Sequence, residues 1–175
     1  MRSIFLAPGF ALRGRMIVAA AIGLGLVACG GQERTRPVQQ AVVNEWTLPA
    51  SSTGYGHNQW VHVPAAVLFP SGSAALTRES MQLLDEGVTS MQSRNDIARL
   101  RVEGHADTEG SELGNYSLSS QRAEAVRAYL VQRGVPYQLI EIVSFGSDRP
   151  VVIEDGYEVN RARNRRVEFS VLFRR

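Results

Sequence analysis

An acidic residue and an arginine fifteen positions apart are the residues of this sequence best suited to bind a charged ligand. Asp107 ends the run Glu-Gly-His-Ala-Asp at 103–107, and Arg122 lies in the stretch LSSQRAEAVRAYL. A fixed carboxylate pairs with an ammonium group, and a guanidinium pairs bidentately with a carboxylate. Held close together, the two side chains would fit the head group of a free amino acid, which has both charges.

The hydrophobic pattern predicts strands and helices that alternate along the chain. Strand-like runs cover 60–69, 98–102, 140–144 and 167–173, and helical patterns cover 77–93 and about 119–133. Pro64 interrupts the first run, which favours an edge strand or a break before Ala65. Gly134 follows the second helix as a C-cap. Strands separated by helices predict an α/β fold with a sheet covered by helices.

This layout predicts where the two charged residues lie. Asp107 is expected in the loop at the carboxyl end of a strand, where ligands bind in such sheets. With Ser119 as N-cap, Arg122 would lie in the first helical turn, where a cation opposes the helix dipole. The pattern therefore predicts that Arg122→Ala weakens ligand binding but changes thermal stability little. The alternative is a role in the fold alone, either as a mutual salt bridge between Asp107 and Arg122 or as caps of the loop.

From about Val67 to Phe173 the sequence resembles the OmpA-like peptidoglycan-binding domain family, which includes OmpA, Pal and MotB. The resemblance rests on VLFPSGSAALT, EGHADTEGSELGNYSLSSQRAEAVRAYL, SFGSDRP and NRARNRRVEF, which follow one another in the family's order. Many relatives have acidic residues in place of Pro70-Ser71-Gly72, and arginine in place of Gln121. The resemblance implies an OmpA-like βαβαβ sandwich with a mixed sheet, which binds the diaminopimelate of peptidoglycan without a covalent bond.

The resemblance also implies roles for individual residues. Asp107 would bind the ammonium of diaminopimelate and Arg122 its carboxylate, and Thr108, Asn115 and loop amides would complete the pocket. Asn115 could equally satisfy the backbone of its loop. No cofactor is implied.

Three further residues are expected near the site, and two of them have two possible roles. Leu118 could form an apolar wall for the ligand stem, or pack on Ala123 at the start of the helix. Arg165 would approach the site by resemblance to the family's closing segment. His105 shares one side of the strand end with Glu103, and is expected to be a buried, hydrogen-bonded histidine rather than a ligand contact.

The first 28 residues resemble a lipoprotein signal peptide. Arg13 and Arg15 precede an uncharged, mostly apolar run at 16–27, which is too short to span a hydrocarbon core of roughly 30 Å. Leu26-Val27-Ala28-Cys29 resembles a lipobox, in which the cysteine is acylated and becomes the first mature residue. The alternative is an ordinary secretory signal with an incidental cysteine. Gly30, rather than aspartate, follows the cysteine, and by resemblance this favours the outer membrane.

The segment 29–59 is polar, lacks a sustained period and is expected to be a flexible tether before a domain at 60–175. Trp46 and the apolar patch 41–43 within it are expected to make at most a transient contact. The domain would then face the periplasm, linking the outer membrane to the wall. The alternative function is that of a Pal-like adaptor whose main role is to bind envelope proteins.

Charge and residue types argue against other functions. Removal of Arg2, Arg13 and Arg15 with the signal leaves 16 basic against 17 acidic residues, so no basic excess favours nucleic acid. Ser111 lacks a convincing base, and the single cysteine is assigned to the lipid, so no enzyme is expected. No metal site is expected at the isolated histidines His57 and His62. The arginine-rich run 161–166 lies among acidic residues and is expected to form local ion pairs.

Overall fold

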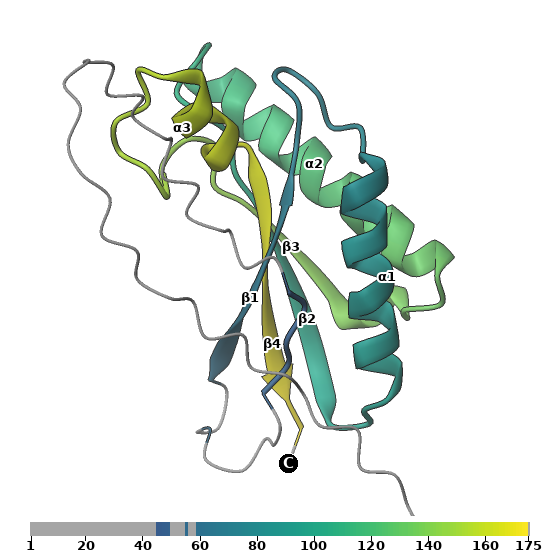
Figure 1. Ribbon diagram of the computed structural model, residues 1–175. Coiled ribbons are helices and arrows are strands. Elements are labelled where there is room, and N and C mark those ends of the chain that lie inside the picture. Colours follow the sequence, from purple (N-terminus) through teal and green to yellow (C-terminus); the bar gives the residue numbers. More distant parts are fainter. Residues whose placement is uncertain (1–44, 50–54, 56–58, 175) are drawn as a thin grey trace, which may run out of the picture. The chain divides into compact units, whose positions relative to one another are not determined.

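The computed structural model describes residues 45–49, 55 and 59–174 of the chain, and the following description concerns these residues. Four strands and four helical segments follow one another (Figure 1). They are β1 (Trp60–Leu68), α1 (Arg78–Gln92), β2 (Ile97–Gly104), α2 (Glu112–Gln132), the 3-10 turn η1 (Tyr137–Leu139), β3 (Ile140–Ser144), α3 (Glu158–Asn164) and β4 (Arg166–Phe173).

The strands form one mixed sheet in the order β1-β4-β2-β3. β4 pairs antiparallel with both β1 and β2, whereas β2 and β3 are parallel. Helices α1 and α2 lie together on one side of this sheet (Figure 1). The predicted α/β class and mixed sheet are therefore confirmed. β1 is an edge strand, and its register shifts between Val63 and Ala66, on either side of Pro64.

The core lies between the sheet and the two long helices. Alternate residues of β4, namely Val167, Phe169 and Val171, are fully buried, as the strand pattern predicts. α1 begins where expected, because the side chain of Thr77 accepts a hydrogen bond from the backbone N–H of Ser80. Within the described part of the chain, none of the helices combines the length and apolar character that crossing a bilayer requires.

The start of α2 differs from the sequence prediction. The N-cap is Ser111, whose Oγ accepts a hydrogen bond from the N–H of Gly114, and not Ser119. Arg122 therefore lies in the middle of a long helix, too far from its N-terminus for the helix dipole to oppose its charge. The hydrophobic pattern does not reveal the first turns of α2, because two polar residues, Asn115 and Ser119, lie on the buried face of the helix.

Trp46 lies in the core, although the sequence places it in a tether. Its side chain is buried, and its ring centroid lies 4.4 Å from that of Phe169. It also packs on α1, where a Cβ added to Gly87 would lie 2.6 Å from the indole ring. The expectation of a transient contact is thus wrong for Trp46. Other expectations for residues 1–44, including the lipid on Cys29, lie outside the described residues.

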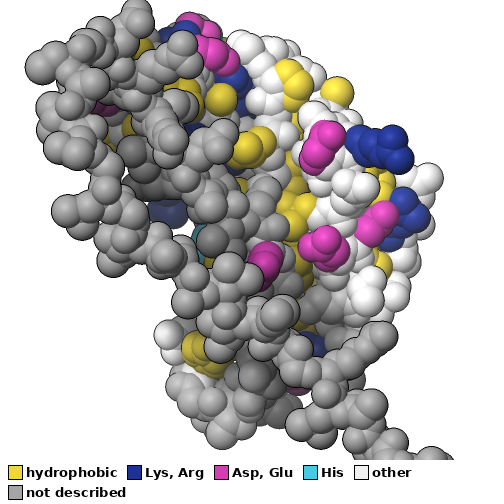
Figure 2. Space-filling view, in the orientation of Figure 1, with side chains coloured by type: hydrophobic (Ala, Val, Ile, Leu, Met, Phe, Trp, Pro, Cys, Tyr) yellow, Lys and Arg dark blue, Asp and Glu magenta, His cyan; other side chains and the backbone are white. Residues whose placement is uncertain are grey.

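Charges of both signs are interspersed on the visible face of the molecule. Figure 2 shows acidic and basic side chains side by side over the described part of this face, without a continuous basic area there. Ion pairs also join surface charges of opposite sign, such as Arg127 and Glu124 on α2. Nucleic-acid binding needs a clustered basic surface, so this face does not favour it.

Candidate ligand-binding site

Four segments meet at the end of the sheet where β2 stops. They are the loop after β2, which contains Asp107, the buried face of α2 with Arg122, the β1–α1 loop, and the junction between α3 and β4 with Arg165. The side chains of all three charged residues are almost completely buried: Asp107 is 6% exposed, Arg122 0% and Arg165 4%. Buried charges of this kind need partners, and those partners define the site.

A close approach of β2 to α2 places the site residues. A Cβ added to Gly104 would lie 2.1 Å from the carbonyl oxygen of Ser119, so glycine lets the strand end touch the helix backbone. The next two residues are fixed by backbone hydrogen bonds, from His105 to Arg166 and from Ala106 to Gly146. The two residues before Asp107 are thus hydrogen-bonded to two different segments of the chain, which fixes the position of Asp107.

Arg165 is the ion-pair partner of Asp107. Its Nη1 donates to Asp107 Oδ2 at 2.9 Å, its Nη2 donates to Glu158 Oε1 at 2.5 Å, and its Nε donates to the carbonyl of Phe69. Hydrogen bonding to Arg165 holds the pKa of Glu158 below its ordinary value. The sequence predicts that Arg165 approaches the site. In the structure, its guanidinium forms an ion pair with the carboxylate of Asp107.

Arg122 makes a different set of contacts. Nε donates to Ser73 O at 2.9 Å, Nη1 to His105 O at 3.0 Å and Nη2 to Pro70 O at 3.2 Å. Within the described residues no ion pair joins Arg122 to a carboxylate, so its mutual salt bridge with Asp107 is not found. Burial lowers the pKa of Arg122 to about 10, and the group remains a cation at neutral pH.

The other expected site residues lie around this centre. Asn115 is buried, and its Nδ2 donates to the carbonyl of Asp107 at 3.0 Å, so it holds the loop backbone. Thr108 is exposed beside the site, with its N–H bonded to Asp155 Oδ2. Leu118 is half-buried within α2, so it cannot staple the helix start.

Sequence reasoning did not identify the backbone groups that hold Arg122. The carbonyls of Pro70 and Ser73 belong to the β1–α1 loop, about fifty positions before Arg122. Any residue type supplies a carbonyl, so no sequence signal marks them. The arginine-rich run 161–166 forms local ion pairs as expected, but the sequence does not show that Glu158 pairs with Arg165 in particular. Ser111, considered there as a nucleophile, caps α2.

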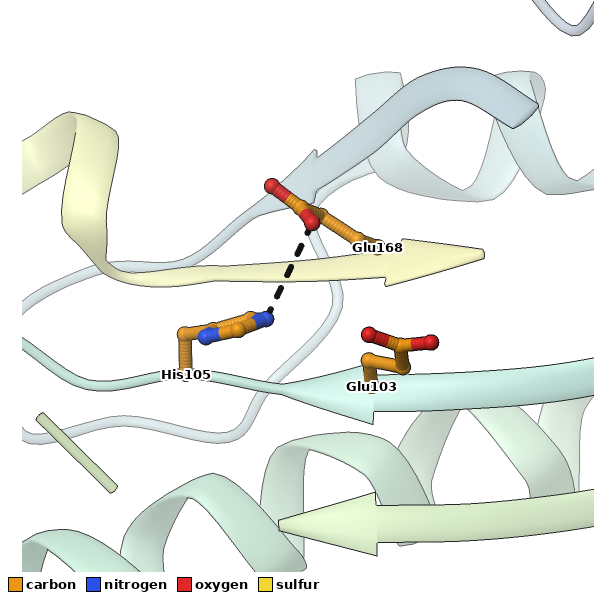
Figure 3. Close-up of side chains that lie close together, drawn as sticks. All are labelled: Glu103, His105 and Glu168. Atoms are coloured by element: carbon orange, nitrogen blue, oxygen red, sulfur yellow. Dashed lines mark ion pairs between the residues drawn. The ribbon is translucent and has the colours of Figure 1, made fainter. Parts of the chain in front are cut away.

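His105 is buried as predicted but is not hydrogen-bonded through its ring. It is 1% exposed, and neither ring nitrogen has a hydrogen-bond partner within the described part of the chain. Figure 3 shows it on the same side of the sheet as Glu103, as the alternation along the strand predicts, with Glu168 of β4 beside them. Burial, with a smaller contribution from Arg166, lowers the pKa of His105 to about 4.

Residues 68–165 match the OmpA family, over more than half of the chain. This chain belongs to the OmpA family. A peptidoglycan-associated lipoprotein of Pseudomonas aeruginosa is 38% identical over 102 residues, which are 58% of this chain and 59% of the relative. One of Agrobacterium fabrum is 26% identical over 143 residues, which are 82% of this chain and 80% of the relative. The chain thus spans about three fifths of the length of the first of these relatives.

Solved OmpA-like structures share the fold. The peptidoglycan-associated lipoprotein from Burkholderia pseudomallei superimposes with a TM-score of 0.58 at 29% identity, covering 61% of this chain and 89% of that one. The C-terminal domain of Helicobacter pylori MotB gives a TM-score of 0.56 at 26% identity, covering 63% of this chain and 84% of that one. The OmpA-like α/β fold expected from the sequence is therefore confirmed.

Proposed function

We propose that this OmpA-family protein binds peptidoglycan non-covalently, without catalysis, and links it to the outer membrane. The observation that carries the proposal is the state of Arg122, a buried cation held by the neutral carbonyls of Pro70, Ser73 and His105. Asp107 acts on this cation only through space, without an ion pair. A buried charge that forms no ion pair is costly, so an anionic ligand group would be favoured beside it. The names of the relatives from Pseudomonas and Agrobacterium support peptidoglycan as the source of that group.

Diaminopimelate fits the two charges of the site. Its carboxylate would pair with the guanidinium of Arg122, and its ammonium with Asp107. One oxygen of Asp107, Oδ2, is bonded to Arg165, whereas Oδ1 receives only a long hydrogen bond of 3.3 Å from the N–H of Glu109. Oδ1 is therefore the oxygen that would accept the ammonium, while Arg165 holds the carboxylate in place.

The β1–α1 loop controls access to Arg122 in this proposal. It forms a turn in which the N–H of Ser73 donates to the carbonyl of Pro70, with Gly72 at a positive φ of 62°. These same two residues supply carbonyls to Arg122. The ligand carboxylate would replace one or both carbonyls as the loop shifts. Asn115 would maintain the conformation of the loop that contains Asp107. Thr108 would lie at the rim of the binding site, and Leu118 beside the ligand stem.

Attachment to the membrane belongs to the same proposal. Cys29 would be acylated and become the first mature residue, so that the domain faces the periplasm from a lipid anchor. Several acyl chains anchor a protein much more firmly than one, because each buried methylene contributes about 0.8 kcal/mol. Labelling of cells with an alkyne fatty acid should mark the parent chain and leave Cys29→Ala unlabelled and released from membranes. Equal labelling of both chains would contradict the anchor.

The decisive experiment compares two kinds of cell wall. The full chain in detergent is sedimented with sacculi that contain either diaminopimelate or lysine at the same stem position. Lysine lacks the carboxylate next to the ammonium, so Arg122 loses its partner, and binding should weaken about ten- to a hundredfold, since charge-assisted hydrogen bonds contribute about 1.5–3 kcal/mol. Equal affinity for both walls at matched salt would overturn the pairing.

Matched arginine variants of α2 test the site itself. Arg122→Lys keeps the charge but cannot form the planar two-pronged contact, so wall binding should fall strongly. Arg127→Lys changes an arginine on the same helix whose partner is Glu124, outside the site, and should bind as the parent does. If both variants bind equally well, Arg122 is not part of the ligand site.

A second candidate function is that of an adaptor for another envelope protein. Exposed apolar side chains occur on and just before α3, beside the site, and favour a protein contact: Val151, Ile153, Tyr157 and Val159. Co-purification from membranes with and without intact sacculi separates the two functions. A partner retained after the wall has been digested would support the adaptor.

A further inference from the structure

Three potential metal ligands lie together on the sheet face opposite α1 and α2. Glu103 belongs to β2, His105 follows the end of β2, and Glu168 lies directly across from Glu103 on β4. Their neighbours Val102 and Val167 are fully buried in the core, so the alternation of the strands turns these side chains to the other face. Figure 3 shows the three side chains converging, with one ligand atom of each within 4.8 Å of the others.

His105 lacks the partners that a buried histidine needs. Its side chain is almost completely buried, and among the residues that the structure describes neither Nδ1 nor Nε2 has a hydrogen-bond partner. The nearest acidic oxygen, Glu168 Oε2, lies 3.9 Å from Nε2, which is too far for a hydrogen bond. An unpartnered polar group in the interior is unfavourable, and here the ring is aimed at two carboxylates. This combination points to a bound cation between them.

In Glu103 and in Glu168, a hydrogen bond to one carboxylate oxygen already fixes the orientation of the group. Glu168 Oε1 accepts from Arg166 Nε at 2.6 Å, which leaves Oε2 toward His105. Glu103 Oε1 accepts from the hydroxyl of Ser170 at 3.1 Å. Metal ligands are commonly held in this way by an outer group that fixes the carboxylate. The positive charges of Arg166 and Arg149 near His105 oppose a cation, and the two glutamates offset them.

We propose that Glu103, His105 and Glu168 form a binding site for a divalent transition metal, with Zn²⁺ as the best match. One imidazole and two carboxylates are established zinc donors, and their bonds of about 2.0–2.2 Å require a modest inward rotation of the side chains. The site replaces the expectation of no metal, which considered only His57 and His62. It is separate from the wall-binding proposal, because neither Asp107 nor Arg122 takes part.

Titration calorimetry with Zn²⁺ tests the site on the full chain in detergent. All samples lack an affinity tag and contain Cys29→Ser, so that the only thiol cannot bind metal. The parent should bind one Zn²⁺ per chain, and Glu103→Gln, His105→Gln and Glu168→Gln should each weaken binding roughly tenfold or more. Glu141→Gln is the matched control, since Glu141 pairs with Arg101 on the neighbouring strands outside the cluster.

The other two histidines provide a second control. The double variant His57→Gln/His62→Gln should bind Zn²⁺ as the parent does, and bound Co²⁺ should give a visible absorption spectrum that disappears in Glu103→Gln. Glu103→Gln is the mildest change, because its amide oxygen still accepts from Ser170, so it decides the question even if the other variants unfold. Absence of binding by the parent, or binding unchanged in Glu103→Gln, would overturn the proposal. Loss confined to the double histidine variant would also overturn it.

Discussion

The carboxylate of Asp107 is bonded to the guanidinium of Arg165, at 2.9 Å and 58 positions further along the chain, while Arg122 is left with carbonyl partners. The two buried arginines thus have different tasks. Arg165 ties the loop after β2 to the start of β4 and fixes the aspartate. Arg122 retains a positive charge that no carboxylate of the described residues neutralises by an ion pair.

Replacement of Arg165 by methionine should lower the free energy of unfolding by about 3–5 kcal/mol, because it leaves the carboxylate of Asp107 buried without its partner. Urea unfolding measures the change. Arg161→Met is the control, since Arg161 pairs with the exposed carboxylates of Glu109 and Glu158 and its loss should cost about 0–1 kcal/mol. Equal losses for both variants would contradict a structural role of the buried pair.

Arg122→Ala should destabilise the fold, in contrast to the small change that the sequence predicts. The substitution removes the donors to three carbonyls, and unsatisfied buried acceptors cost about 1–3 kcal/mol each, which the relief of a buried charge partly offsets. We expect a net loss of about 2–4 kcal/mol by chemical unfolding. Arg127→Ala is the control on the same helix: Arg127 is half-buried and pairs with the exposed Glu124, so its loss should change stability by less than about 1 kcal/mol. An unchanged midpoint for Arg122→Ala would show that these hydrogen bonds do not stabilise the domain.

Trp46→Ala should cost about 3–5 kcal/mol, because the indole fills the space between Gly87 of α1 and Phe169 of β4. A fragment that begins at Asn58 should show a similar loss. Trp60→Ala is the comparison, since Trp60 is only half-buried under Arg101 and should cost about 1 kcal/mol. If the fragment is as stable as the longer chain, Trp46 does not belong to the core.

Acid should weaken the metal-free protein through His105. Its pKa is lowered from 6.5 to about 4 in the folded state, mainly by burial, so between these values the unfolded chain binds a proton that the folded chain does not. The free energy of unfolding should therefore decrease as pH falls from 6.5 to 4, by on the order of 2–3 kcal/mol at about 1.4 kcal/mol per pKa unit. Urea titrations in the presence of a chelator measure this slope. His105→Gln should reduce this pH dependence of the free energy of unfolding. His62→Gln, which changes an exposed residue, should leave the pH dependence as it is in the parent.

The fold could be predicted where local patterns decide it. Thr77 as a cap, the alternation in β4 and the position of Pro64 on an edge strand all follow from short-range chemistry. The start of α2 could not, because Asn115 and Ser119 are polar residues on a buried face and interrupt the hydrophobic period. Tertiary hydrogen bonds satisfy them there: Asn115 bonds the Asp107 loop, and Ser119 accepts from the N–H of Gly146.

The sequence predicts which residues lie near one another in the candidate site better than it predicts their pairings, and their role in ligand binding stays a prediction. Asp107, Arg122, Asn115 and Arg165 do converge. The choice of Arg165 rather than Arg122 as the partner of Asp107 depends on where α3 ends and β4 begins, and short-range patterns do not contain that geometry. Trp46 was missed for a similar reason, since a single aromatic residue without a period gives no sign that it packs into a core.

The position of β4 also limits when the domain can fold. β1 and β2 do not touch as neighbours in the sheet, because the strand formed by residues 166–173 lies between them and pairs with both. Until that segment is available, β1 has no partner strand, and the carboxylate of Asp107 has no Arg165. Contacts between distant segments form slowly and late. A chain that emerges from its N-terminus therefore cannot complete this four-stranded sheet until nearly all of the described sequence is available.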